Sequence, residues 1–295
     1  MKKIALLGPG TFTEESAHYF LGRSSYEYVN YKLIPDVFQS TVDGMTDYSV
    51  IPIENTFEGS VNLHVDTLVH EVDLPIQAEW VYPISINLLR LPQEGVASGT
   101  MEESCKRIRK VYSHGVTLAQ CQQFLRQYLP HVELEAVGSN GEAARLVKEL
   151  ARTQVAALAP LAAGTMYGLE TLAKGIHDHE DNFTRFILIG REKFEGAKPA
   201  NRTKTTILVT LPSDYPGALH QVLSAFSWRR INLSKIESRP TKKKLGTYFF
   251  YIDIEASMDS VLLPAALQEI EAIGCQVRIL GCYPTYDYVP DTSEV

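Results

Sequence analysis

Short apolar runs alternate with segments of helical spacing along the first 190 residues of the chain. The apolar runs lie at 4–7, 49–53, 110–112, 132–137 and 155–158, and the helical segments that follow them lie at 13–22, 61–70, 117–128, 141–150 and 161–168. Strands and helices that alternate in this way form mostly parallel sheets covered by helices. We therefore predict an α/β unit with two lobes.

The middle segment Leu74–Arg90, LPIQAEWVYPISINLLR, is extended and rich in β-forming residues, and it contains two prolines. We expect it to carry the chain from one lobe to the other, with the second lobe spanning roughly residues 78–155. A cleft between two lobes is the usual place for a small ligand. The ligand site is therefore expected between the lobes.

A second, smaller domain is predicted after a polar linker at 191–203, which contains Gly196 and Pro199 and shows no apolar period. The first domain is thus placed at 1–190, the second at 204–285 and a C-terminal tail at 286–295. Strand, helix, strand, strand, helix and strand are expected at 204–211, 216–228, 232–239, 247–255, 260–273 and 275–283. This βαββαβ order is ferredoxin-like. By fold analogy alone, such a module is more often regulatory than catalytic.

Composition narrows the class of protein. Apolar residues make up 45% of the chain, but none of its apolar runs approaches the ~20 residues of a membrane helix, so no membrane partner is expected. The N-terminal apolar run ends at Gly8-Pro9, which is short for a signal peptide, and we expect a cytoplasmic protein. The net charge is -7 and the one cationic run, Lys242–Lys244, falls in a predicted turn, so no nucleic-acid partner is expected.

Neither metal nor disulfides are expected. The four cysteines, at 105, 121, 275 and 282, form no CxxC pair, and a chain of this size does not need cross-links to fold. His177 and His179 in IHDHED have no supporting cluster of ligands nearby. We therefore predict reduced thiols and no metal site.

Polar side chains gather where the predicted strands of the first domain end. Glu54, Asn55 and Thr56 follow one strand, and Ser60 is placed to cap the next helix. Open α/β sheets bind their ligands at this edge. Because these groups carry more hydrogen-bonding chemistry than a turn needs, a functional interpretation is slightly favoured over a simple connection.

At two other predicted strand ends, the residues are compatible with either a structural or a functional role. Ser113-His114 precedes a helix, where the histidine either packs structurally or positions an anion or a proton. The turn Gly8-Pro9-Gly10 leads into Thr11 and Glu14, which have the spacing of a capping box. Its N–H groups are candidates for holding a carboxylate, although a structural helix start is favoured.

The stretch DNFTRF, residues 181–186, places the Thr184 hydroxyl beside the Arg185 guanidinium at the start of an apolar run. In the second domain, Gly217 begins a helix and IESRP, residues 236–240, ends a strand with charge and proline. That pattern is typical of a protected edge strand. It equally suits an amino-acid pocket at a subunit interface.

Taken in order, GPGTFTEES, PIENTFEGS, SHGVTLAQC, DNFTRF, PGALHQVL and IESRP resemble prephenate dehydratases that carry a C-terminal ACT domain, over nearly the whole chain. The resemblance implies a two-lobed catalytic domain like the periplasmic binding proteins, followed by a ferredoxin-like ACT domain. It implies a lyase without cofactors that converts prephenate to phenylpyruvate in L-phenylalanine biosynthesis. It also implies feedback inhibition by L-phenylalanine at ACT domains that pair into a homodimer or homotetramer.

The same resemblance assigns residues to roles. The catalytic set is Thr184, Arg185, Glu54, Asn55 and Thr56; the substrate-binding set is Thr11, Phe12, Ser60, Ser113, His114 and Phe186; the effector set is Gly217, Ala218, Leu219, Glu237, Ser238, Arg239 and Pro240. Many family members have proline and glutamine after the serine-histidine pair, whereas this chain has Gly115 and Val116. The role of His114 is therefore left open.

The chemistry requires little more than orientation and a proton donor, because aromatisation drives the loss of carbon dioxide and water from prephenate. We expect Thr184 to be the donor and Glu54 to support it by orienting Arg185. Glu54 is the rival acid if burial raises its pKa. Arg185 and the N–H groups near Thr11 are candidates to hold the two carboxylates of the substrate.

Three alternatives remain open, and the simplest is a chain that uses TRF only structurally, which the ordered set of motifs argues against. An arogenate dehydratase would use the same fold on a substrate that bears an amino group. A non-enzymatic amino-acid sensor would use the two-lobed fold and the ACT domain for binding only, although the polar set at 54–56 and 184–185 argues against it.

Overall fold

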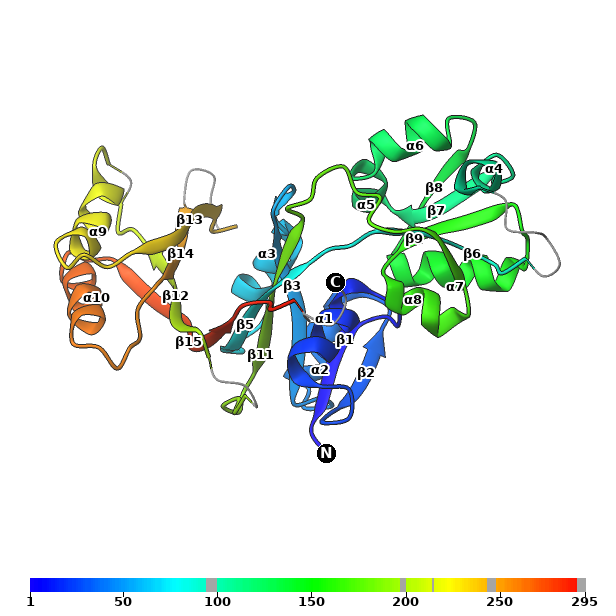
Figure 1. Ribbon diagram of the computed structural model, residues 1–295. Helices are drawn as coiled ribbons and strands as arrows, with labels where there is room; N and C mark the ends of the chain where they lie inside the picture. The colour runs from blue at the N-terminus through cyan, green and yellow to red at the C-terminus, as the bar shows by residue number, and fades with distance from the viewer. Residues whose placement is uncertain (94–99, 197–199, 214, 243–247, 291–295) are drawn as a thin grey trace. The chain divides into compact units, whose positions relative to one another are not determined.

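The computed structural model describes residues 1–93, 100–196, 200–213, 215–242 and 248–290 (Figure 1). They divide into two compact units. The first unit contains Met1–Asp73, Val81–Phe186 and residues 288–290, and the second contains Leu74–Trp80 and Ile187–Asp287. The segment predicted as a linker, 191–203, lies inside the second unit, which begins at Ile187 and also includes a short segment from the middle of the chain.

The first sheet of the first unit begins with three parallel strands. β1 (Lys3–Leu7) lies between β2 (Glu27–Tyr31) and β3 (Tyr48–Asn55), and the short β4 (Gly59–Ser60) pairs antiparallel with β3. The accompanying helices are α1 (Phe12–Leu21), α2 (Ile34–Val42) and α3 (Asn62–His70). Residues such as Ile4, Leu6 and Ile51 are fully buried, as expected for strands covered by helices.

The second sheet of the first unit has the strand order β10-β6-β9-β7-β8. These strands are β6 (Asn87–Arg90), β7 (Lys110–His114), β8 (Glu133–Val137), β9 (Val155–Ala159) and β10 (Glu170–Ala173); the helices are α4 (Met101–Cys105), α5 (Gly115–Ala119), α6 (Gln122–Tyr128), α7 (Asn140–Leu150) and α8 (Leu161–Tyr167). The two-lobed α/β prediction is confirmed. The second sheet continues to Ala173, past residue 155, because the buried strand β9 lies between β6 and β7.

The helix expected over 117–128 is divided into α5 and α6. The Asp178 carboxylate accepts hydrogen bonds from the backbone N–H groups of Gln122 (2.9 Å) and Gln123 (3.0 Å), and so caps the start of α6. The Asp178 N–H donates to the Gln120 carbonyl oxygen at 2.8 Å. Sequence reasoning missed this break because the cap comes from a residue 56 positions away.

Close packing at glycine joins the turn before α1 to the second lobe. A Cβ atom on Gly141, in the first turn of α7, would overlap the Pro9 carbonyl oxygen. A Cβ on Gly10 would lie 3.2 Å from side-chain atoms of Ala163 and Tyr167. Phe12 packs against the core of the second lobe. The turn therefore has a packing role that requires small residues on both sides.

The second unit contains the predicted ferredoxin-like arrangement. Its elements are β12 (Arg202–Thr210), α9 (Ala218–Ser227), β13 (Leu233–Pro240), β14 (Tyr248–Ile254), α10 (Leu262–Ala272) and β15 (Gln276–Tyr286), with the sheet order β13-β14-β12-β15. One face of each helix packs on the sheet through residues such as Val222, Phe226 and Leu263. The βαββαβ prediction is confirmed. Only part of the lysine run at 242–244 lies within the described residues.

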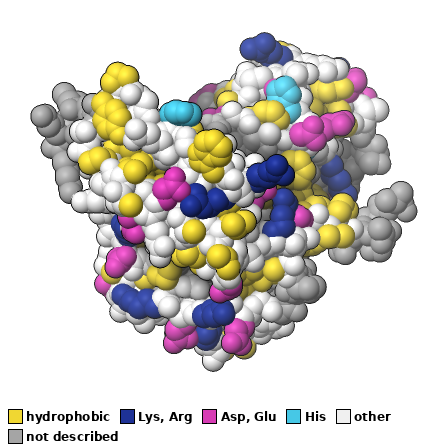
Figure 2. Space-filling view, turned by 90° about the vertical axis from the view of Figure 1, so that its left-hand side faces the viewer, with side chains coloured by type: hydrophobic (Ala, Val, Ile, Leu, Met, Phe, Trp, Pro, Cys, Tyr) yellow, Lys and Arg dark blue, Asp and Glu magenta, His cyan; other side chains and the backbone are white. Residues whose placement is uncertain are grey.

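The outer surface near α9 and α10 is mixed in character. Figure 2, which views the side of Figure 1 where these helices lie, shows hydrophobic side chains interspersed with acidic and basic ones. Trp228 and Val261 are the most exposed of the apolar side chains there, at 83% and 85%. Among the described residues, none of the helices combines the length and apolar character that a membrane crossing requires.

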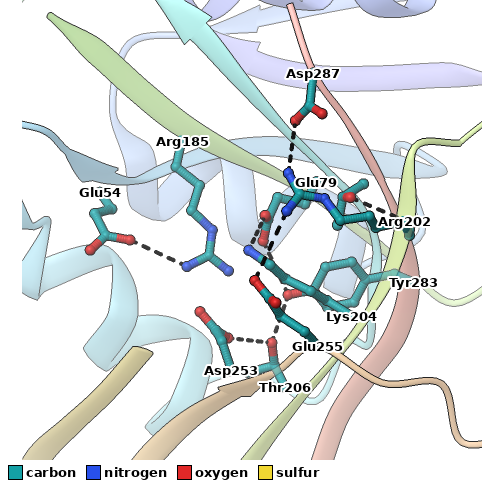
Figure 3. A network of polar contacts seen from close by, with 11 residues as sticks. Glu54, Glu79, Arg185, Arg202, Lys204, Thr206, Asp253, Glu255, Tyr283 and Asp287 are labelled. Carbon is teal, nitrogen blue, oxygen red and sulfur yellow. Dashed lines mark hydrogen bonds and ion pairs between the residues drawn. The ribbon is translucent and has the colours of Figure 1, made fainter. Parts of the chain in front are cut away.

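A fifth strand, β5 (Ile76–Pro83), adds to the second unit's sheet by pairing parallel with β15. Its Glu79 carboxylate is buried and pairs with the Lys204 ammonium at 2.7 Å, and it accepts a hydrogen bond from the Tyr283 hydroxyl at 3.2 Å (Figure 3). Thr206 lies 2.6 Å from the Tyr283 hydroxyl and donates to Asp253 at 2.6 Å. Because buried charges are stable only when paired, this network specifies where β5 sits in the sheet.

Candidate active site

The polar residues predicted at the ends of two strands meet in the first unit. β11 (Phe183–Gly190) lies beside β3 in the sheet. The Thr56 N–H donates to the Phe183 carbonyl oxygen at 2.9 Å, and the Thr56 hydroxyl accepts from the Phe183 N–H at 3.1 Å. Thr56 therefore sets the register of the two segments. Ser60, on β4, lies opposite Glu54 in the β3–β4 ladder.

Two side-chain pairs connect the strands. Asn55 Nδ2 donates to Thr184 Oγ1 at 3.0 Å, and Arg185 Nη1 lies 3.2 Å from Glu54 Oε2 (Figure 3). Successive side chains of a strand point to opposite faces of the sheet. The amide–hydroxyl pair and the ion pair therefore occupy different faces.

The ion pair joins a buried guanidinium to a half-buried carboxylate. Arg185 is 7% exposed, and the side chain of Glu54 is 35% exposed. A buried guanidinium needs an acceptor, because an unpaired charge away from water is strongly destabilising. Glu54 supplies one. Phe186, the next residue, is 1% exposed, so its ring lies in the core.

Three carboxamides form a closed hydrogen-bonded ring beside Thr184. Asn55 Nδ2 donates to Asn182 Oδ1 at 2.9 Å, Asn182 Nδ2 to Gln120 Oε1 at 2.9 Å, and Gln120 Nε2 to Asn55 Oδ1 at 3.3 Å. Asn182 precedes β11, and Gln120 ends α5 in the second lobe. Gln120 and Asn182 were not predicted as site residues, although they lie within the motifs SHGVTLAQC and DNFTRF.

At the end of β7, Ser113 is buried and His114 is partly buried. Ser113 is fully buried; its hydroxyl donates to the Leu158 carbonyl oxygen at 2.8 Å and accepts from Asn140 Nδ2 at 3.1 Å. Burial lowers the pKa of His114 below its usual 6.5, opposed in part by the charge of Glu58. His114 is therefore a neutral imidazole at pH 7, able to donate one hydrogen bond and accept another.

The turn at Gly8–Thr11 is already engaged in local hydrogen bonds. The Gly10 N–H donates to the buried Glu14 carboxylate at 2.7 Å. Thr11 Oγ1 donates to the Leu7 carbonyl oxygen at 2.8 Å and accepts from the Glu14 N–H at 3.3 Å. These contacts satisfy donors that a helix start otherwise leaves unpaired.

The two histidines of IHDHED, His177 and His179, contact different parts of the chain. His177 Nδ1 accepts from the Ile86 N–H at 3.5 Å, and the His179 ring stacks on Phe57 with centroids 4.6 Å apart. Within the described residues, no group of three or more histidine, cysteine, aspartate or glutamate side chains is arranged to hold a metal ion.

Comparison with known proteins identifies the family of the chain. The sequence profile of the prephenate dehydratase family matches residues 4–194, more than half of the chain. The chain belongs to the prephenate dehydratase family. A second profile, that of the ACT domain, matches residues 205–275.

Relatives in the family match along most of their length. The prephenate dehydratase of Bacillus subtilis is 43% identical over 289 residues, which cover 96% of this chain and 99% of the relative. The prephenate dehydratase of Lactococcus lactis subsp. cremoris is 40% identical over 286 residues, covering 96% and 98%. The crystal structure of the Arthrobacter aurescens prephenate dehydratase in complex with L-Phe superposes with a TM-score of 0.81 at 33% identity, covering 96% of this chain and 90% of that one.

In this member of the prephenate dehydratase family, the predicted effector residues lie on two elements of the ACT domain. Gly217 precedes α9 with φ +91°, and a Cβ there would meet open space. Ala218 and Leu219 form the first turn of α9, with Ala218 buried. On the edge strand β13, Glu237 pairs with Lys235 (3.3 Å) and Arg239 (3.4 Å), while Ser238 and Pro240 are exposed.

Proposed function

We propose that the chain is a prephenate dehydratase, which removes carbon dioxide and water from prephenate to give phenylpyruvate and is inhibited by L-phenylalanine at its ACT domain. Membership of the family over nearly the whole chain supports the reaction. The observation that carries the mechanism is the Thr184 hydroxyl, which is held by Asn55 at 3.0 Å. The Arthrobacter relative in complex with L-Phe supports the effector.

The reaction breaks two bonds to ring carbons of the substrate, one C–C bond and one C–O bond. The C–C bond to the ring carboxylate breaks, carbon dioxide leaves, and the electron pair aromatises the ring as the ring hydroxyl departs with the electrons of its C–O bond. One dianion thus gives carbon dioxide, hydroxide and the phenylpyruvate anion. Thr184 donates a hydrogen bond to the departing oxygen, which strengthens as charge builds there, and the departing hydroxide takes a proton from solvent to become water.

The remaining site residues take supporting roles in this proposal. Glu54 orients Arg185 through the 3.2 Å ion pair, and Thr56 keeps β3 and β11 in register. Phe12, Ser60 and His114 line the substrate, with His114 available as a neutral donor, while the buried Thr11 holds the start of α1 through its bonds to Leu7 and Glu14. Because Ser113 and Phe186 are buried, they act by supporting the strands that carry their neighbours.

The ACT domain also supplies the proposed assembly. β13 is an edge strand whose outward residues include Ile236, 44% exposed, and edge strands pair readily with other chains. A homodimer or homotetramer formed along this edge would place L-phenylalanine between Gly217–Leu219 of one protomer and Glu237–Pro240 of its partner. The protein is proposed to work in the cytoplasm.

The deciding experiment follows phenylpyruvate formation by the purified protein from prephenate, with and without L-phenylalanine and with a metal chelator throughout. We expect turnover that L-phenylalanine suppresses. Turnover of arogenate in place of prephenate would redefine the substrate. Binding of L-phenylalanine without turnover of either compound would contradict the enzymatic proposal and favour the sensor.

A further inference from the structure

The hydrogen-bonded ring of the Asn55, Asn182 and Gln120 carboxamides lies beside the Thr184 hydroxyl. We propose that Asn182 is a positioning residue: through Asn55, it directs the hydroxyl proton of Thr184 toward the substrate. This inference rests on the proposed role of Thr184 as hydrogen-bond donor, and it concerns a residue with no contact of its own to the Thr184 hydroxyl.

The orientation of the Asn55 amide is determined by its neighbours. Asn55 Oδ1 accepts from the backbone N–H groups of Phe57 at 3.0 Å and Glu58 at 3.3 Å. Backbone N–H groups only donate, so the atom facing them must be the oxygen. Nδ2 consequently faces Asn182 and Thr184.

That orientation decides what the Thr184 hydroxyl can do. An amide nitrogen has no acceptor capacity, so Thr184 Oγ1 must accept in its 3.0 Å contact with Asn55 Nδ2. Over the described residues, Asn55 is the one hydrogen-bond partner of Thr184 Oγ1. The hydroxyl proton is thereby turned away from Asn55 and kept available for an acceptor, which in the proposed reaction is the leaving oxygen.

Asn182 controls how the two N–H bonds of Asn55 are shared. Three acceptors surround Asn55 Nδ2: Asn182 Oδ1 at 2.9 Å, the Phe183 carbonyl oxygen at 3.0 Å and Thr184 Oγ1 at 3.0 Å. Asn182 takes one hydrogen, which leaves the other directed between Phe183 and Thr184. Without Asn182, the Nδ2 end loses one of its three acceptors, and the amide can tilt about its soft terminal torsion within the range that the contacts of Oδ1 allow.

Asn182 is itself held firmly enough to serve as this anchor. It is 2% exposed, its side chain donates to Gln120 at 2.9 Å, and its backbone oxygen accepts from the Ile84 N–H at 2.7 Å. Gln120 in turn donates to Asn55 Oδ1. Removing Asn182 therefore takes away the acceptor of one Asn55 N–H and the partner that orients Gln120.

The test compares Asn182→Ala with a matched control, Asn87→Ala. Asn87 is also a fully buried carboxamide of the first unit, hydrogen-bonded to the Ser85 and Ala159 carbonyl oxygens at 2.9 and 3.3 Å. Asn182→Ala should lower kcat on prephenate by about 10- to 100-fold, the cost of a small misplacement, with KM changed less than about three-fold. Asn87→Ala should keep kcat within about three-fold even where it lowers the thermal unfolding temperature.

A double-mutant cycle separates positioning from general damage. In an Asn55→Ala background, Asn182→Ala should lower kcat less than about three-fold further, because its effect passes through Asn55. Independent, multiplicative losses would overturn the inference, as would an effect on KM alone or a loss equal to that of Asn87→Ala. If Asn182→Ala does not fold, the cycle is run with Asn182→Asp, which keeps the acceptor for Asn55 but not the donor to Gln120. Its loss of kcat should be below about 10-fold and should shrink in the Asn55→Ala background, and an equal loss in both backgrounds would overturn the inference.

Turnover of prephenate by the wild-type protein shows whether a negative result concerns this inference alone or also the proposed function. Turnover of prephenate by the wild type with an unchanged kcat in folded Asn182→Ala would overturn the positioning role alone. No turnover by the wild type would overturn the proposed function and the inference together.

Discussion

Asn55 and Thr184 are 129 positions apart in the chain, and Asn55 Nδ2 donates to Thr184 Oγ1 at 3.0 Å. Their neighbours Glu54 and Arg185 form an ion pair on the other face of the same two strands. One register between β3 and β11 thus produces both pairs. The motifs ENT and TRF thus place a hydrogen-bonding pair on one face of the two strands and a charged pair on the other.

Replacing Thr184 separates hydrogen bonding from shape. Thr184→Ser keeps the hydroxyl and should retain most of kcat, whereas Thr184→Val keeps the shape and should lower kcat by roughly 100- to 10,000-fold, the usual range for a proton-transfer group. Steady-state kinetics on prephenate checks both variants. Substantial activity in Thr184→Val would exclude the hydroxyl as donor.

Glu54→Gln should be milder than Thr184→Val. The Glu54 carboxylate already serves as acceptor for Arg185, and a glutamine oxygen can still accept that hydrogen bond without the charge. We expect a moderate loss of kcat and an unchanged shape of the profile of kcat against pH. A loss as large as that of Thr184→Val, with the acid limb of the profile missing, would instead make Glu54 the acid.

Glu15 should make the stability of the protein depend on pH. Burial raises its pKa from 4.5 to about 7, opposed by the Ala162 N–H and the charge of Arg23. Between these values the folded state binds more protons than the unfolded state, so stability falls as pH rises from about 4.5 to 7. Glu15→Gln should remove this dependence and gain at most about 3 kcal/mol at pH 8.

Urea unfolding of the wild type and of Glu15→Gln at pH 5, 6, 7 and 8 measures this effect. Glu71→Gln, at an exposed position, is the control. Its free energy of unfolding should change with pH in the same way as that of the wild type. A Glu15→Gln curve that also stays parallel to the wild type would show that Glu15 does not titrate in this range.

Gly217→Val should remove inhibition by L-phenylalanine and leave uninhibited activity within about three-fold. Valine fits the open space there but strains a backbone with φ +91° and covers the predicted effector pocket. Gly274→Val, at a second left-handed glycine of the same domain (φ +93°), is the matched control and should keep inhibition. The readout is the L-phenylalanine concentration that halves turnover. Full inhibition of Gly217→Val would place the effector elsewhere.

Much of the fold could be read from local pattern. The βαββαβ order and the two lobes followed from strand and helix periods, which depend on neighbouring residues. The division of α5 from α6 did not, because the Asp178 side chain that caps α6 comes from a distant loop. The segment 74–90 was interpreted as a connection, yet Glu79 places β5 in the second unit's sheet through its pair with Lys204.

The sequence by itself determined which residue types stand at the ends of the strands: Glu54, Asn55, Thr184 and Arg185 were all identifiable from it. Only the tertiary structure decided how they pair. The face that each side chain occupies depends on the register of β3 and β11, which a shift of one residue would reverse. The ring that joins Asn55 to Asn182 and Gln120 likewise exists only once segments far apart in the chain have packed together.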